Sequence, residues 1–304
     1  MAVEAVGEQI ATIGDLELCY ETFGDPSGPA VLLVMGLGTQ MIGWHDEFCA
    51  GLAERGFHAI RYDNRDIGRS SHFDGHKAPG LWEMFTRRPK DPAYTLDDMA
   101  DDGVRLLDHL GIGRAHVVGA SMGGMIAQLM AARYPDRVLS LVSIMSSTGS
   151  RWSGQPAVRV LPYLFGRADG GKEAYVNRMT KIFQAIGSRG FERGDDEIRE
   201  IAARSYDRGV SEAAFARQLG AIMASGSRVE DLRRIKAPTL VIHGTKDPLI
   251  KPSGGRATAR AIPDAKLMMV KGMGHDLPRG AWPQVIDGIV ANAARASQPS
   301  PAAA

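Results

Sequence analysis

The sequence predicts an α/β protein, in which a mostly parallel sheet is flanked by helices and carries an inserted helical cap. Short β-branched or apolar runs alternate with longer helical patterns along the 304 residues, which is typical of parallel strands joined by covering helices. Residues 147–236 break this alternation, because they show mainly helical patterns and no clear strand. We therefore expect a core of residues 1–146 and 237–296, a cap of residues 147–236 and a disordered tail at residues 297–304.

Eight short segments have the composition of strands, with β-branched or apolar residues between turn formers. A Gly/Pro-rich turn at residues 24–29 separates an opening hairpin from the parallel part. The strands are expected at residues 9–13, 17–23, 30–35, 58–62, 115–118, 138–145, 239–243 and 266–270. The helices of the core are expected at residues 45–55, 96–110, 122–134, 254–261 and 282–294.

The composition argues against several classes of protein. Lys plus Arg (36) nearly balances Asp plus Glu (35), so the chain lacks the positive charge that binds nucleic acid or an anionic membrane. No stretch approaches the ~18 apolar residues of a membrane span. The N-terminus carries early glutamates and no apolar signal-peptide segment. We therefore expect a cytoplasmic protein that acts on a small molecule, without nucleic acid or membrane as a partner.

Metal sites are not expected. The two cysteines, Cys19 and Cys49, are expected to be buried free thiols, because no disulfide or metal spacing surrounds them. No cluster of His, Cys and Asp has the spacing of metal ligands. The sequence pattern contains no signal for an oligomeric state.

The strongest local signal is Gly119-Ala120-Ser121-Met122-Gly123, which lies between an expected strand and an alanine-rich helix. It matches G-x-S-x-G in the strand–turn–helix setting that presents a nucleophilic serine. The turn is so sharp that side chains two residues away would clash, and glycine at both positions removes the clash. The serine hydroxyl then lies at a helix N-terminus, which favours developing negative charge. Ser121 is therefore the expected nucleophile.

A serine nucleophile needs a base, and the base needs an orienting carboxylate. With this type of serine turn the acid comes next along the chain and the histidine comes last. His275, in the loop GMGH after the last expected strand, is the expected base. Asp247, in the turn HGTKDP, is the expected acid. The alternative position, after the strand that ends at residue 145, offers only Ser146 and Ser147.

Two backbone N–H groups should bind the oxyanion of the tetrahedral intermediate. The residue after the nucleophile supplies one of them, and here it is Met122. The other is expected from the loop MGLGT after the third strand, where glycines let the backbone approach a substrate closely. The N–H of Leu37 is the expected donor.

The substrate pocket is expected to be mostly apolar with few polar anchors. Met35 and Gly36 should line it from the loop after the third strand, and Met145 from the end of the sixth. Phe183 and Met223 should line it from the cap. This lining predicts a preference for neutral esters over charged ones.

The charged run RYDNRDIGRS at residues 61–70 is expected to be structural. Asp63 and Arg65 should form an ion pair beneath the serine turn and hold this loop. Two further histidines, His45 and His243, are expected to pack or to form hydrogen bonds near the site rather than to act in it.

Together these motifs resemble the α/β-hydrolase superfamily over essentially the whole chain. The segment LLVMGLGTQMIGWHDEFCAGLAERGFHAIRYDNRDIGRS is also similar to the aclacinomycin methylesterase group and related bacterial esterases. The resemblance implies an eight-stranded sheet, a helical cap, no cofactor and ester hydrolysis. Many members of the superfamily have His-Gly where this chain has Met35-Gly36, whereas the methylesterase group resembles the chain there.

Three functions are compatible with these residues. The first is that of a carboxylesterase or small-molecule methylesterase that forms an acyl-enzyme on Ser121. The second is another Ser-His-Asp reaction, such as enol-lactone opening, C–C bond hydrolysis or cofactor-free perhydrolysis. The third is a ligand-binding receptor that retains a slow hydrolase site. Fold alone does not decide among them.

Overall fold

An eight-stranded sheet forms the centre of the protein. The structure, a computed structural model, describes residues 5–86, 89–164, 170–192 and 194–297. The strands are β1 (Gln9–Ile13), β2 (Leu16–Phe23), β3 (Ala30–Val34), β4 (His58–Tyr62), β5 (Ala115–Ala120), β6 (Val138–Ile144), β7 (Thr239–Gly244) and β8 (Lys266–Val270). Their order in the sheet is β1-β2-β4-β3-β5-β6-β7-β8. β2 runs antiparallel to both of its neighbours, and the pairings from β4 to β8 are parallel.

The predicted sheet is confirmed. Each expected strand is present, and the largest difference is at β5, which continues two residues further than expected. Every residue of β3, β4 and β5 is buried, because helices cover the parallel strands on both faces. The carboxyl ends of these strands therefore meet at one edge of the sheet, which is where an α/β fold places its site.

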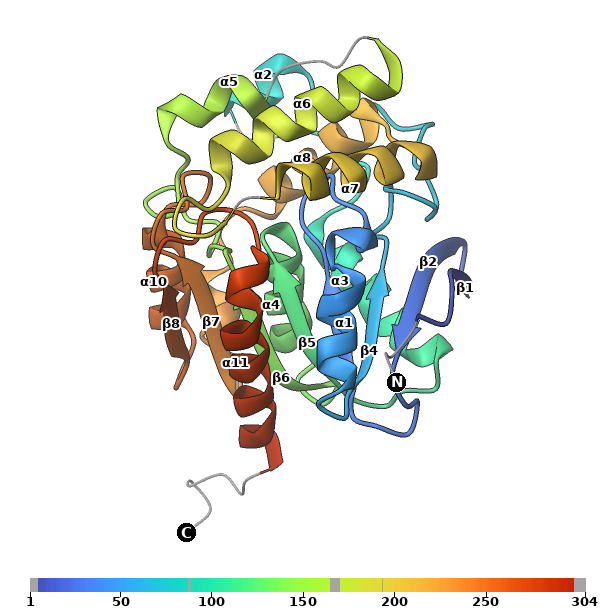
Figure 1. Ribbon diagram of the computed structural model, residues 1–304, viewed down its shortest axis with the longest axis vertical. Helices are drawn as coiled ribbons and strands as arrows, with labels where there is room; N and C mark the ends of the chain where they lie inside the picture. Colours follow the sequence, from blue (N-terminus) through green and yellow to red (C-terminus); the bar gives the residue numbers. More distant parts are fainter. Residues whose placement is uncertain (1–4, 87–88, 165–169, 193, 298–304) are drawn as a thin grey trace.

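Helices form a layer on each face of the sheet and a third layer above it (Figure 1). The α-helices are α1 (Asp46–Ala53), α2 (Leu81–Thr86), α3 (Leu96–His109), α4 (Met122–Arg133), α5 (Leu161–Leu164), α6 (Gly171–Ile186), α7 (Asp195–Arg208), α8 (Glu212–Ser225), α9 (Val229–Leu232), α10 (Pro252–Ala261) and α11 (Trp282–Ala294). Short 3₁₀ helices occupy Met41–Gly43, Val158–Val160, Arg279–Ala281 and Arg295–Ser297. α1 and α11 pack on one face, and α3, α4 and α10 pack on the other.

The chain between β6 and β7 forms the helical insertion that the sequence predicts. Helices α5 to α8 lie beyond the carboxyl ends of the strands, together with α2 (Figure 1). The next helix, α9, instead packs against α4 and α10 of the core. The division into a core of residues 1–146 and 237–296 and a cap of residues 147–236 stays a prediction. Most of the tail expected to be disordered, residues 298–304, lies outside the described residues.

The expected ion pair between Asp63 and Arg65 is wrong. Asp63 is fully buried and instead pairs with Arg208 of α7, with 2.8 Å between Nη2 and Oδ2. Arg65 pairs with Asp102 of α3, with 2.6 Å between Nε and Oδ2. Although the two residues are only two positions apart, the Asp63 side chain is directed to the inserted helices and the Arg65 side chain to the core.

A second buried ion pair joins the same loop to the cap. Asp66 lies in the left-handed backbone region, with φ +71°. Its carboxylate accepts two hydrogen bonds from Arg217 of α8, at 2.6 and 2.8 Å. Both side chains are almost completely buried. The loop after β4 is therefore structural, as predicted, but its partners come from the inserted helices.

One buried arginine holds the two ends of the insertion together. Arg228 is 1% exposed, and its guanidinium donates to the carbonyls of Ser147 (2.7 Å) and Gly226 (3.3 Å). Its own N–H donates to the carbonyl of Thr148 (2.8 Å). Burial lowers the pKa of Arg228 to about 10. The insertion therefore leaves the core and returns to it at a single point.

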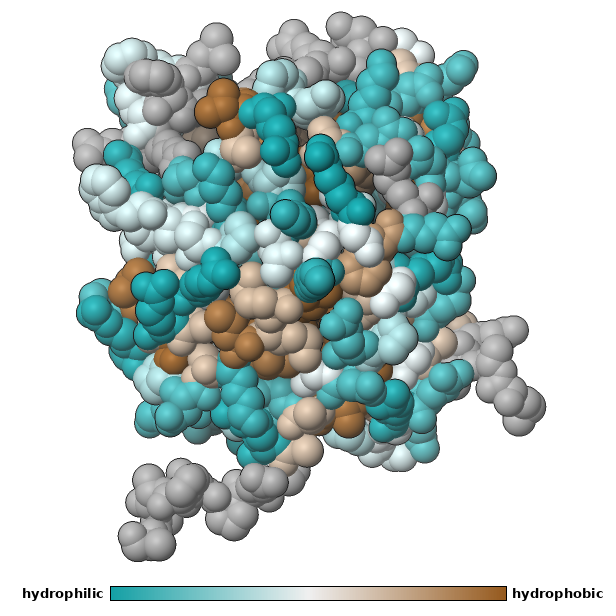
Figure 2. All heavy atoms as spheres, turned by 60° about the vertical axis from the view of Figure 1, so that its left-hand side comes forward, coloured by the Kyte–Doolittle hydropathy of each residue, from teal (hydrophilic) through white to brown (hydrophobic). Residues whose placement is uncertain are grey.

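The sheet ends on β8, where four of five residues are exposed or half-buried. Leu267 of this strand is 40% exposed. Figure 2, which turns this side of the molecule forward, shows apolar side chains gathered in the lower half of the face and polar ones around them. Among the described helices, none has the length and apolarity to cross a membrane. Both cysteines are buried free thiols, as predicted.

Candidate active site

The turn between β5 and α4 presents Ser121. Its backbone has a positive φ, with φ +56° and ψ −117°, which is a strained conformation for a residue with a side chain. A Cβ at Gly119 would lie 2.1 Å from the carbonyl oxygen of Gly123, and one at Gly123 would lie 2.1 Å from that of Val34. Glycine is therefore required on both sides of the serine, as the motif predicts.

The three predicted triad residues meet in one chain of hydrogen bonds. His275 Nε2 lies 2.9 Å from Ser121 Oγ, and His275 Nδ1 lies 2.8 Å from Asp247 Oδ2. His275 is 7% exposed and Asp247 is 3% exposed. Ser121 is only half-buried, so the reactive oxygen is the accessible end of the chain. The geometry is that of a nucleophile, a base and an orienting acid.

Backbone groups hold the Asp247 carboxylate from its other side. Its Oδ1 accepts from the N–H groups of Leu249 and Ile250, both at 2.9 Å. Among the described residues, no arginine or lysine forms an ion pair with it. The carboxylate is thus fixed by neutral donors, and its charge stays available to a protonated imidazole.

A second histidine lies beside the same carboxylate. His243 Nε2 is 2.8 Å from the carbonyl of Ile250 and 3.5 Å from Asp247 Oδ2. His243 is fully buried, and this burial lowers its pKa. A neutral imidazole that donates to a carbonyl supports the turn without cancelling the charge of Asp247, in line with the supporting role predicted for it.

The end of α6 holds the loop that carries the base. The N–H of His275 donates to the carbonyl of Ile186 (2.8 Å). The Ser188 hydroxyl accepts from the N–H of Gly274 (2.9 Å) and donates to Asp276. Burial raises the pKa of Asp276. Sequence reasoning missed Ile186 and Ser188, because neither a backbone carbonyl nor a lone serine leaves a spacing signal.

The loop after β3 lies directly beside the serine. A Cβ at Gly36 would be 3.1 Å from the Cβ of Ser121 and 3.6 Å from its Oγ, so a side chain there would crowd the serine, and glycine favours this close approach of the backbone. Leu37 is the next residue. On the other side, Met122 is the first residue of α4, where an N–H has no acceptor within the helix. Of the two expected oxyanion donors, Met122 is therefore next to the nucleophile in the sequence, and Leu37 follows a residue that lies beside it in space.

The expected pocket residues fall into two groups. Met35 and Gly36 lie at the turn beside the serine, since a Cβ at Gly123 would come within 2.6 Å of the Met35 carbonyl oxygen. Met145 follows β6 with φ +43° and is 4% exposed. Phe183 on α6 and Met223 on α8 are half-buried. Their place in the pocket stays a prediction.

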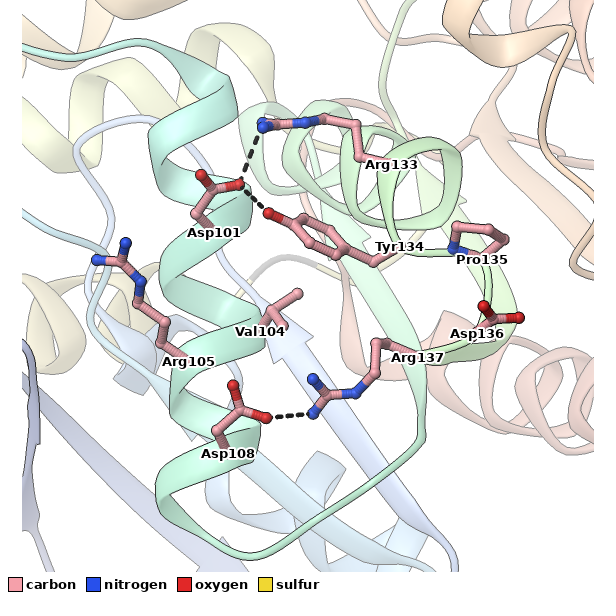
Figure 3. A pocket seen from close by; sticks show the side chains of 9 residues that line it. All are labelled: Asp101, Val104, Arg105, Asp108, Arg133, Tyr134, Pro135, Asp136 and Arg137. Carbon is pink, nitrogen blue, oxygen red and sulfur yellow. Dashed lines mark hydrogen bonds and ion pairs between the residues drawn. The ribbon is translucent and has the colours of Figure 1, made fainter.

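A cavity of about 500 Å³ lies away from these residues, between α3 and the end of α4 (Figure 3). Its charges neutralise one another. Asp101 accepts from the Tyr134 hydroxyl (2.7 Å) and pairs with Arg133 (3.1 Å). Arg137 pairs with Asp108 (2.6 Å). No triad residue lines this cavity, so it is not a candidate for the substrate site.

One group of side chains has the composition of a metal site. Asp66, His72 and Asp74 place their ligand atoms within 4.8 Å of one another. The guanidinium of Arg217 already bonds to both carboxylates, at 2.6 Å from Asp66 and 3.1 Å from Asp74. The guanidinium of Arg217 already supplies the positive charge at this position, so these residues do not fit a metal ion.

Known proteins with similar sequences include a methylesterase and an enol-lactonase. A rhodomycin D methylesterase of Streptomyces sp. (strain C5) is 30% identical over 291 residues, which cover 89% of this chain and 92% of the relative. The 3-oxoadipate enol-lactonase 2 of Acinetobacter baylyi is 28% identical over 262 residues, which cover 86% and 87%. Among solved structures, an enol-lactonase from Burkholderia xenovorans LB400 superposes with a TM-score of 0.74, at 24% identity, over 93% of this chain and 99% of that one.

A family model described as the alpha/beta hydrolase fold matches residues 29–278. That range begins before β3 and ends after His275, so it includes the serine turn and both loops that complete the hydrogen-bonded chain. The eight-stranded sheet with a helical insertion agrees with it. The chain therefore belongs to the α/β-hydrolase family.

Proposed function

We propose that the protein is a serine hydrolase that cleaves a carboxylic ester through an acyl-enzyme on Ser121. The observation that carries the proposal is the continuous hydrogen-bonded chain from Ser121 Oγ through His275 to Asp247, at 2.9 and 2.8 Å. A serine hydroxyl is a weak nucleophile until an adjacent base accepts its proton. Here the base lies within reach and the acid orients it.

The first half-reaction forms the acyl-enzyme. His275 Nε2 accepts the hydroxyl proton while Ser121 Oγ attacks the ester carbonyl carbon. The carbonyl oxygen becomes an oxyanion, for which the N–H groups of Leu37 and Met122 are the proposed donors. His275 then gives its proton to the alcohol oxygen as the C–O bond breaks, and the alcohol leaves.

The second half-reaction releases the acid. His275 takes a proton from a water molecule, whose oxygen attacks the acyl carbon through a second oxyanion. The proton returns to Ser121 Oγ, and the carboxylic acid is freed. Throughout both steps the buried charge of Asp247 stabilises the imidazolium and keeps the same ring nitrogen facing the serine.

The proposed substrate is a neutral ester with an apolar acyl or alcohol group. The methylesterase relative supports a small-molecule ester. Met35 and Met145 belong to the same buried apolar cluster as Ala120, the residue before the serine, and this supports an uncharged group in the pocket. Phe183 and Met223 are the proposed contributions of the cap.

Enol-lactone opening is a second candidate, because an enol-lactonase aligns over 86% of this chain. A lactone is an intramolecular ester, so the same serine attack would open it, and the leaving alcohol would stay attached to the acyl group. A substrate panel separates the two functions. The first is supported by turnover of open-chain esters, and the second by turnover of lactones alone.

The test uses p-nitrophenyl esters of increasing chain length, apolar methyl esters and lactones. Ser121→Ala should abolish turnover and remain folded, since a half-buried hydroxyl at a turn contributes little to the core. Adding His275→Ala should cost little more, because triad residues act as a unit. A phosphonate adduct should map to Ser121 by mass spectrometry. An adduct on another serine, or full activity of Ser121→Ala, would contradict the proposal.

A further inference from the structure

The loop after β3 makes a tight turn beside the serine. The N–H of Thr39 donates to the carbonyl of Gly36 (3.2 Å), which closes a β-turn with Leu37 and Gly38 at its centre. Gly38 has φ +65°, the left-handed conformation that a type II turn takes at this position. Because a trans peptide holds its N–H opposite its carbonyl, the N–H of Leu37 points out of the turn.

The next peptide is held at both of its polar atoms. The carbonyl of Leu37 accepts from the Thr39 hydroxyl (3.3 Å), and the N–H of Gly38 donates to Oε1 of Gln218 (2.9 Å). Gln218 lies on α8 of the insertion and is fully buried. Its Nε2 donates to the carbonyl of Arg65 (2.9 Å). One side chain of the cap thus joins this turn to the loop after β4.

The same helix covers the turn. Phe215 lies three residues before Gln218, so the two side chains share a face of α8. A Cβ at Gly38 would be 2.5 Å from Cδ2 of the Phe215 ring. Residue 38 must therefore be glycine both for its backbone angle and for the space that the ring leaves.

We propose that Gln218 is a positioning residue for the oxyanion site. By holding the Leu37–Gly38 peptide, it fixes the direction of the Leu37 N–H, so that α8 takes part in stabilising the tetrahedral intermediate without touching the substrate. This inference rests on the proposed ester hydrolysis. Without Gln218 the N–H of Gly38 loses its acceptor in the protein, and the turn is free to rotate its peptides. A misdirected donor weakens the transition state more than the bound ester.

The test compares variants of Gln218 in the full-length protein. Gln218→Met removes both hydrogen bonds with little change in volume. We expect kcat to fall roughly 10- to 100-fold, somewhat less than for a donor that is deleted outright, and KM to change less than about threefold. Inactivation by a phosphonate, whose oxygen occupies the oxyanion site, should slow by the same factor as kcat. Gln218→Glu keeps an acceptor for the Gly38 N–H but loses the donor to the Arg65 carbonyl, so it should recover only part of the loss.

Gln128→Met is the matched control. Gln128 is equally buried, but it lies on α4 and donates to the Ser143 hydroxyl (3.0 Å) rather than to the turn. This variant should lose a similar amount of thermal stability and keep kcat within about twofold. In Gln218→Met and Gln128→Met, the pH at which kcat reaches half of its maximum should be the same as in the wild type, because His275 keeps its hydrogen-bond partners.

Hydrogen exchange separates this inference from the proposed reaction. The Gly38 amide should exchange faster in Gln218→Met than in the wild type, whether or not an ester is turned over. Equal exchange rates, an unchanged kcat, or a raised KM with kcat retained would each overturn the assignment. If the wild type hydrolyses no ester of the panel, the proposed function fails by itself, and the Gly38 amide still decides whether Gln218 holds the turn.

Discussion

Asp247 and Asp66 follow parallel strands of one sheet, at the same edge and at similar depth, yet they are held in opposite ways. Asp247 is bound by two backbone N–H groups and by the ring of His275. Asp66 is bound by the Arg217 guanidinium through two hydrogen bonds, by the Tyr94 hydroxyl (2.8 Å) and by one backbone N–H, that of Phe73 (3.1 Å). Both carboxylates are almost inaccessible to solvent.

The difference separates a carboxylate suited to chemistry from one that anchors structure. A guanidinium cancels the charge of Asp66 permanently, so this pair serves to dock α8 on the loop after β4. Neutral donors leave the charge of Asp247 intact until the imidazole beside it becomes protonated. Burial alone therefore does not identify the acid of a triad, whereas the charge of its partners does.

The largest expected effect comes from removing the charge of Asp247. Asp247→Asn keeps the shape and an acceptor for the two backbone N–H groups, so the melting temperature should change little. Its amide cannot stabilise an imidazolium, and it favours the wrong ring tautomer. We expect kcat on p-nitrophenyl esters to fall by about 10³- to 10⁴-fold. Near-normal turnover would show that another acid orients His275.

Breaking the Asp66–Arg217 pair should have the opposite result, a large loss of stability and a small loss of activity. Arg217→Met leaves the Asp66 carboxylate buried without its partner, which typically costs about 3–5 kcal/mol of unfolding free energy. Urea denaturation measures this loss, and kcat per folded molecule should fall far less than in Asp247→Asn. The double variant Asp66→Asn/Arg217→Met removes the uncompensated charge and should be more stable than Arg217→Met. Additive losses in the double variant would mean that the two side chains are not coupled.

The anchoring pair also predicts how stability depends on pH. Burial acts to raise the pKa of Asp66, but the hydrogen bonds from Arg217, the Phe73 N–H and the Tyr94 hydroxyl, together with the charge of Arg217, outweigh it and hold that pKa below its ordinary value. The unfolded chain therefore binds this proton first as the pH falls. The stability that the pair contributes is present above about pH 4 and is lost progressively below it. Urea midpoints measured from pH 5 to pH 3 should fall less steeply in Asp66→Asn/Arg217→Met than in the wild type.

The smallest expected effect concerns an ion pair in solvent. Arg55 and Asp287 are 2.7 Å apart, and their side chains are 47% and 61% exposed. Water and salt screen such a pair, so Arg55→Gln should change the unfolding free energy by less than about 0.5 kcal/mol. A loss comparable to that of Arg217→Met would show that exposure does not separate the two kinds of pair in this protein.

The sheet, and the three residues that meet in one hydrogen-bonded chain, could be predicted from the sequence because their signals are local. Strand runs, the glycines around Ser121 and the order of acid and base along the chain need no knowledge of tertiary contacts. The pairing of Asp63 with Arg65 was wrong for the complementary reason. Its true partner, Arg208, is 145 residues away, and sequence proximity favoured the nearer cation.

The contributions of the cap could not be predicted for the same physical reason. Gln218 and Ser188 each form two hydrogen bonds to groups of loops that are distant in the sequence. An amide or a hydroxyl at one helical position has no spacing pattern that separates it from a solvated surface residue. Only the tertiary structure, which brings α8 and the residues after α6 against these loops, shows the contacts.

The hydrogen bonds of Arg228, which join the two ends of the insertion, have a consequence for how such proteins diversify. Because they tie residues 147–148 to residues 226–228, the insertion is in effect a closed loop whose length is uncoupled from the register of the sheet. Lengthening a closed loop is inexpensive, at about 0.6 kcal/mol for each doubling. The insertion is thus an exchangeable module, in which a different set of helices between the same two ends would meet the same catalytic edge with a new surface.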